Sequence, residues 1–150
     1  MSPLVILHLT CSLLSYTAFL AAFFCGVLFL IQERQLKHKH MGWLFHRLPP
    51  LGDLDRINFF AIGAGFALLS LGAVFGFVGS AVLLGRWWTG DPKEYFTVML
   101  WGAYCVLWIV RLRATLRGRR VALLSILGFS LVVFTFVGVS WLLPSWHPSL

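Results

Sequence analysis

The sequence predicts an all-α integral membrane protein, folded as a bundle of four transmembrane helices. The chain of 150 residues is 59% hydrophobic and only 11% charged, whereas roughly 25% of the residues in soluble domains are charged. A helix crosses the bilayer with about 20 mostly apolar residues, and four stretches of the chain meet this requirement. We expect one membrane domain, residues 1–150, with spans at about 3–31, 57–84, 95–112 and 121–143.

The first stretch runs directly into charged residues without a small-residue cleavage site, so we interpret it as a spanning helix and not as a secretory signal peptide. Small residues recur at helical spacing in three of the stretches, a pattern that lets helices approach closely in lipid. They are Ser12, Ser15, Ala22 and Gly26 in the first stretch, Gly65, Gly72, Gly76 and Gly79 in the second, and Gly128, Thr135 and Gly138 in the fourth. These faces predict a compact bundle.

The segment between the first two stretches, residues 32–58, mixes apolar and basic side chains on either side of Pro49-Pro50. Its Trp-Leu-Phe run at 43–45 favours a short segment that lies on the membrane interface. Three histidines in this segment are loosely spaced and have no cysteine or carboxylate cluster beside them, so a solvated basic loop is favoured over a metal site. They are His38, His40 and His46.

The basic residues predict the orientation of the spans, because positively charged loops stay in the cytoplasm. Three groups lie between successive spans: Arg34, Lys37, Lys39, Arg47 and Arg56; Arg86 and Lys93; and Arg111, Arg113, Arg117, Arg119 and Arg120. The first and third loops are therefore expected inside, with both termini on the outer, periplasmic side of the inner (cytoplasmic) membrane. Contact with anionic lipid headgroups accounts for the net charge of +7, so no nucleic-acid partner is expected.

The outer loop between the second and third spans reads Gly-Arg-Trp-Trp-Thr-Gly-Asp-Pro-Lys-Glu at 85–94. Asp91 is suited to cap the third helix, with Pro92 at its first position and Glu94 completing a capping box. Trp87 and Trp88 fit the aromatic belt of a membrane interface. Capping and anchoring leave unexplained why two tryptophans stand immediately before the cap.

Two histidines, His8 in the first span and His147 after the fourth, fall on the same outer surface because the chain crosses the membrane an even number of times. With the tryptophan-rich loop between them, they are a candidate pair of axial ligands for haem iron. Arg86 or Lys93 would then meet the haem propionates. The chain has no Cys-x-x-Cys-His, so such a haem would be b-type and held without a covalent bond. The cysteines, interpreted as packing residues in the spans, are Cys11, Cys25 and Cys105.

Several short segments combine into a more specific signature. They are His8, Leu13-Leu14-Ser15-Tyr16, Gln32-Glu33-Arg34-Gln35-Leu36, Gly85-Arg86-Trp87-Trp88, Asp91-Pro92-Lys93-Glu94, Arg117-Gly118-Arg119, Gly128-Phe129, Phe134-Thr135-Phe136 and Gly138-Val139. This signature resembles that of the membrane cytochrome c assembly proteins, the tryptophan-rich CcsA/CcmC type of haem-handling protein. The resemblance implies that His8 and His147 are the axial haem ligands and that Trp87, Trp88 and Asp91 belong to the loop that holds the haem. Family members commonly carry a tryptophan at the position of Gly90, and most are longer, with additional helices.

Three functions remain open on the sequence alone. The favoured one is a haem-binding membrane subunit of cytochrome c biogenesis, which holds haem at the outer face for delivery or ligation to apocytochrome c and works with other membrane subunits. The chain has no outer-facing thiol pair, so we assign no catalytic residue and do not expect it to act as an enzyme alone. The second is a small bis-histidine electron-transfer or accessory subunit of a respiratory complex. The third is a regulatory membrane protein without haem.

Overall fold

The computed structural model describes residues 2–113, 118–138 and 141. Its helices are α1 (Pro3–Lys37), α2 (Trp43–Arg47), α3 (Leu51–Leu84), α4 (Pro92–Leu112), α5 (Arg119–Val133) and the π-helical turn η1 (Phe134–Gly138), which continues α5. Within these described residues, four segments are long and apolar enough to cross a membrane: α1, α3, α4, and α5 together with η1. The predicted fold class, an all-α multi-pass membrane protein, is confirmed.

Two helices extend beyond the expected spans. α1 continues past residue 31 to Lys37, and α3 begins at Leu51 instead of residue 57. Charged side chains end an apolar stretch without ending a helix, and Lys37 pairs with Glu33 one turn earlier at 3.1 Å. With 35 residues at 1.5 Å each, α1 is about 50 Å long, longer than the roughly 30 Å hydrocarbon core. Part of this helix therefore extends past the apolar layer.

The short segment expected at 43–45 is helix α2, none of whose residues is buried in the chain. The ring of Trp43 is 71% exposed, and the guanidinium of Arg47 lies over it, 4.9 Å from the ring centroid. This combination of an exposed aromatic ring and a cation agrees with a helix at a membrane interface. Its contact with lipid stays a prediction.

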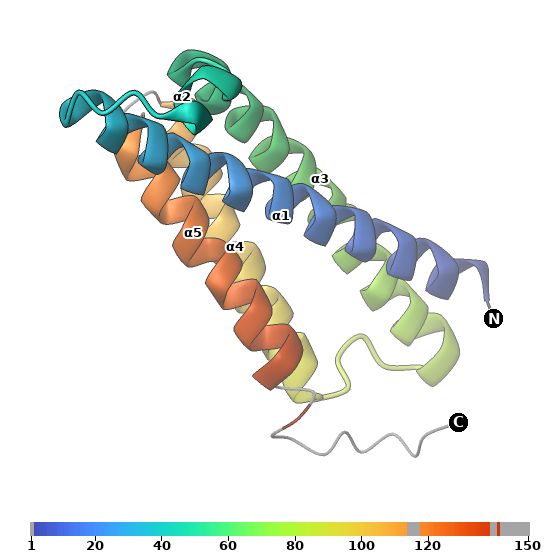
Figure 1. Ribbon diagram of the computed structural model, residues 1–150. Helices are drawn as coiled ribbons and strands as arrows, with labels where there is room; N and C mark the ends of the chain where they lie inside the picture. The colour runs from blue at the N-terminus through green and yellow to red at the C-terminus, as the bar shows by residue number, and fades with distance from the viewer. Residues whose placement is uncertain (1, 114–117, 139–140, 142–150) are drawn as a thin grey trace.

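The four long helices pack as a ring in which α1 contacts α3 and α5, while α4 contacts the same two neighbours. Figure 1 shows α1 and α3 converging on α4 and α5 at the end that holds α2, and diverging from them toward the N-terminus and the α3–α4 connection. We call these the convergent and divergent ends. Between them, the buried ring of Phe19 on α1 stacks on Tyr104 of α4, with 3.6 Å between the centroids.

The glycine face of α3, predicted to pack against another helix, packs against α1. A Cβ added at Gly65 would lie 2.6 Å from the ring of Phe19, and one at Gly72 would lie 3.1 Å from the hydroxyl of Ser12. The missing side chains let the backbones approach, so that the buried Ser15 hydroxyl donates to the carbonyl oxygen of Gly65 at 2.9 Å.

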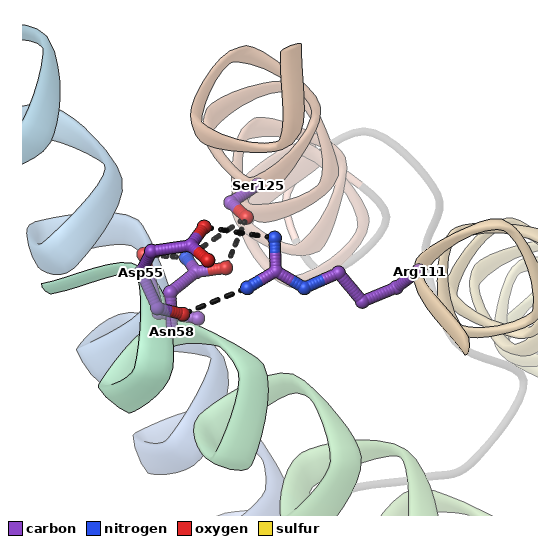
Figure 2. Close-up of polar contacts among 5 residues, drawn as sticks. Asp55, Asn58, Arg111 and Ser125 are labelled. Atoms are coloured by element: carbon purple, nitrogen blue, oxygen red, sulfur yellow. Dashed lines mark hydrogen bonds and ion pairs between the residues drawn. The ribbon is translucent and has the colours of Figure 1, made fainter. Parts of the chain in front are cut away.

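A buried polar network joins the helices at the convergent end (Figure 2). Arg111 on α4 donates from Nη1 to Oδ1 of Asp55 at 2.9 Å and from Nη2 to the Asp55 carbonyl oxygen at 2.7 Å. Asn58 donates from Nδ2 to the Ala22 carbonyl oxygen at 2.8 Å and to the Ser125 hydroxyl at 3.1 Å. The side chains of this network connect α3 to α4 and to α5, and the Ala22 carbonyl adds the backbone of α1.

The structure corrects the place of Arg111, which the sequence analysis counted among the basic residues of the third loop. Arg111 lies in the last turn of α4, and its side chain is 3% exposed. Its charge is compensated by Asp55, so it does not belong to a solvated cytoplasmic loop. The orientation of the spans, including the outer position of both termini, stays a prediction that rests on the other basic residues.

Candidate functional site at the divergent end

His8 lies near the start of α1 and contacts α3. Its Nδ1 is 2.6 Å from the carbonyl oxygen of Gly72. Because a carbonyl oxygen only accepts hydrogen bonds, Nδ1 carries the proton and donates it, which leaves Nε2 of the neutral ring with a free lone pair. Histidines that bind metals typically donate their other ring N–H to a carbonyl or carboxylate in this way. The ring of His8 is therefore held in the tautomer that suits a ligand through Nε2.

The close approach of His8 depends on Gly76. A Cβ at this position would lie 2.9 Å from Nδ1 and 3.0 Å from Cε1 of the imidazole, so the ring would have to move. At Gly79, by contrast, an added Cβ would make only an ordinary contact, 3.8 Å from Cβ of Leu4. The Gly72-x-x-x-Gly76 pair, predicted as packing residues, thus also positions the imidazole. Gly72 does so through its carbonyl oxygen, and Gly76 does so by leaving space where a side chain would be.

His8 lines a cavity of about 370 Å³ between the start of α1, the second half of α3 and the start of α4. Pockets for small molecules have volumes of roughly 300–1,000 Å³. Most lining residues are apolar, and α4 contributes Lys93, Glu94 and Thr97. Its lining residues belong to the parts of α1, α3 and α4 that lie at the divergent end in Figure 1. It therefore combines an imidazole, apolar walls and a small number of charged groups.

The tryptophan-rich loop is attached to the wall of this cavity. Trp88 stacks on Phe77 with 5.9 Å between the ring centroids and meets Tyr95 edge-on at 5.0 Å. Phe77 also lines the cavity. Trp87 is 68% exposed and Arg86 is exposed, and neither residue lines the cavity. Of the two tryptophans, Trp88 is thus the one linked to the cavity wall through a neighbouring ring.

The cap of α4 fixes the shape of the loop. As predicted, Asp91 is the N-cap, and its carboxylate accepts a hydrogen bond from the backbone N–H of Lys93 at 3.0 Å. The carboxylate of Glu94 reaches further back and accepts from the N–H groups of Thr89 at 3.0 Å and Gly90 at 3.1 Å. These two acidic residues therefore hold the loop on the end of α4.

The structure brings together some of the predicted site residues and not others. His8 and Trp88 lie at the same end, because His8 lines the same cavity as Phe77, on which Trp88 stacks. The position of His147 lies outside the described residues. Of the two cations considered for a propionate, Lys93 lines the cavity and Arg86 does not. Phe77 and the carbonyl of Gly72 were not predicted as parts of the site. The sequence did contain one signal for the contact of His8 with Gly72. The pair Gly72 and Gly76 in the second span lies at the same depth in the membrane as His8 in the first span.

Comparison with known proteins agrees with the resemblance found in the sequence. The family model for the cytochrome c assembly protein matches residues 1–147. Similar curated proteins include cytochrome c biogenesis protein CcsA of Guillardia theta, which is 28% identical over an alignment of 153 positions, gaps included, that covers 92% of this chain and 51% of the relative. CcsA of Prochlorococcus marinus strain MIT 9312 is 29% identical over an alignment of 160 positions, gaps included, which covers 94% of this chain and 52% of the relative.

CcsA of Chlamydomonas reinhardtii is 29% identical over 136 residues, which cover 91% of this chain and 37% of the relative. The chain thus spans about half the length, or less, of these curated relatives. No solved structure matches it. Because the family model matches nearly the whole sequence, the chain belongs to the cytochrome c assembly protein family.

Proposed function

We propose that this chain binds b-type haem at the divergent end of the bundle and presents it, on the outer side of the membrane, for cytochrome c maturation. The observation that carries the proposal is the state of His8. Its Nδ1 donates to the Gly72 carbonyl oxygen at 2.6 Å, so Nε2 is available to iron while the ring lines a cavity of about 370 Å³. Membership of a family whose relatives are named for cytochrome c biogenesis supports the same function.

The residues of the site have separate roles in this proposal. His8 would ligate the haem iron, and His147, outside the described residues, would be the second ligand. Phe77 and Trp88 provide aromatic surface, and Lys93 meets a propionate through a charge-assisted hydrogen bond. The tetrapyrrole supplies the groups that become joined to an apocytochrome, while the protein contributes binding, orientation and exclusion of water.

The thiols for covalent attachment must come from the apocytochrome. Cys11 and Cys25 lie within α1 and Cys105 lies within α4, and all three are free. We propose that other membrane subunits bring the apocytochrome to the site.

The visible absorption spectrum of the purified protein tests this function. The parent chain, expressed with sufficient haem and purified in detergent, is expected to show low-spin, six-coordinate haem. His8→Ala and His147→Ala should each abolish that low-spin spectrum, whereas His40→Ala, in the exposed segment before α2, should preserve it. A parent without low-spin haem contradicts the proposed function, and an unchanged spectrum in His8→Ala contradicts the ligand assignment.

A further inference from the structure

A second cavity, of about 290 Å³, lies at the convergent end, between the end of α1 and the start of α5. It is lined by Glu33, Arg34, Lys37, His38 and Arg119. Three of these side chains are cations and one is a carboxylate, so the lining carries a net charge of +2 when His38 is neutral. The proposed haem site uses none of these residues.

The cations of this cavity are incompletely compensated by the protein. Glu33 already pairs with Lys37 at 3.1 Å. In the part of the chain that the structure describes, no carboxylate forms an ion pair with Arg34 or Arg119. A guanidinium offers donors in a planar fork that matches the oxygens of a phosphate or carboxylate. Two such groups on facing helix ends therefore favour an anionic ligand with several oxygens.

The depth of the cavity indicates where such an anion would come from. The apolar run of α1 ends near Ile31, and that of α5 begins at Val121. Arg34 and Arg119 therefore lie two or three residues beyond these runs, within about 5 Å along the helix axis. This is the headgroup level of a bilayer, where basic pockets between spanning helices bind anionic lipids.

A neighbouring cavity adds one apolar residue. This cavity, of about 480 Å³, is lined by Ile31 together with Arg34, Gln35, His38 and His40, and Ile31 is 37% exposed. A free phosphate ion would make no use of the exposed Ile31 side chain, whereas the acyl chain of a lipid would cover it. We propose that this region binds an anionic phospholipid, with Arg34 and Arg119 donating to the headgroup phosphate and Ile31 contacting an acyl chain.

Lipid retention tests this site. The full chain is reconstituted in vesicles of equal parts phosphatidylglycerol and phosphatidylcholine, extracted in mild detergent, and its bound lipids are counted by native mass spectrometry. The parent is expected to retain phosphatidylglycerol in preference to phosphatidylcholine. With about fivefold in affinity per cation near a membrane surface, the double variant Arg34→Gln/Arg119→Gln should bind phosphatidylglycerol roughly 25-fold more weakly. Arg34→Lys, which keeps the charge, should retain most of the binding.

The matched control is Arg120→Gln, which removes the same charge from the adjacent exposed residue, outside the cavity lining. It should leave lipid retention unchanged. Equal retention of both lipids by the parent, full retention by the double variant, or an equal loss in Arg120→Gln would each overturn the proposal. Displacement of the lipid by inorganic phosphate at similar concentration would overturn the lipid assignment. The haem spectrum of the same samples is recorded as well. It distinguishes a failure of the lipid proposal from a failure of the proposed function.

Discussion

The ion pair between Asp55 and Arg111 predicts an asymmetric response to mutation. We consider two variants, Asp55→Ala, which removes the carboxylate, and Arg111→Met, which removes the guanidinium but keeps an unbranched apolar side chain. Both break the 2.9 Å contact between Nη1 and Oδ1. Asp55→Ala leaves a positive charge unpaired, and Arg111→Met leaves a negative charge unpaired. How far the remaining charge is exposed to solvent decides how much stability is lost.

In Asp55→Ala the guanidinium of Arg111 remains, and the Arg111 side chain is only 3% exposed. Of its two hydrogen bonds to residue 55, only the one to the backbone carbonyl oxygen is kept. Breaking a buried pair in this way costs roughly 3–5 kcal/mol, and we expect about 3 kcal/mol because water reaches one side of the pair. In Arg111→Met the remaining carboxylate is 28% exposed and can be hydrated. We therefore expect a smaller loss, about 1 kcal/mol.

The measurement is the free energy of unfolding in mixed micelles, titrated with a denaturing detergent and followed by tryptophan fluorescence and circular dichroism. The double variant Asp55→Ala/Arg111→Met should be more stable than Asp55→Ala alone, because it leaves no unpaired charge in the bundle. If Arg111→Met destabilises the protein as much as Asp55→Ala, or if the double variant is the least stable of the three, the reasoning from burial is refuted.

Three further predictions concern single residues. Gly76→Ala should displace the ring of His8 and weaken haem binding at least tenfold in a spectral titration. Gly79→Ala, on the same face with a nearest contact of 3.8 Å, should bind haem like the parent. Equal losses of haem affinity in the two variants would show a general packing effect. Glu94→Ala removes an acceptor of two backbone N–H groups of the loop. The free energy of unfolding should therefore fall by about 1 kcal/mol, and amide hydrogen exchange at residues 85–91 should accelerate. Unchanged hydrogen exchange would contradict this role of Glu94. Asn58→Leu should cost about 1 kcal/mol in the same micelle titration, a typical value for interhelical hydrogen bonds in membranes, and a gain in stability would contradict it.

The elements that the sequence predicted well have local causes. Four apolar stretches, the glycine face of α3 and the cap of α4 at Asp91 are properties of consecutive or helically spaced residues. The helix ends were less predictable, because α1 and α3 continue as helices through charged residues. Hydropathy reports where an apolar layer ends, which differs from where backbone hydrogen bonding ends.

The candidate site was predictable only in outline. His8 and the tryptophan-rich loop were recognised from residue type and from the even number of crossings. In the structure, His8 lines the same cavity as Phe77, on which Trp88 stacks. The sequence contained no sign that Phe77 would stack on Trp88, because that contact depends on how the loop folds back over α3.

The sequence by itself determined that this chain is built from four membrane-spanning helices, which of their faces approach one another, and to which family it belongs. Hydropathy and helical spacing are local properties, so they can be read along the chain. Only the tertiary structure decided that Arg111 is buried against Asp55 and that His8 donates to Gly72. These partners are 56 and 64 residues apart, and whether they meet depends on the rotation and crossing of whole helices, which packing of the bundle sets.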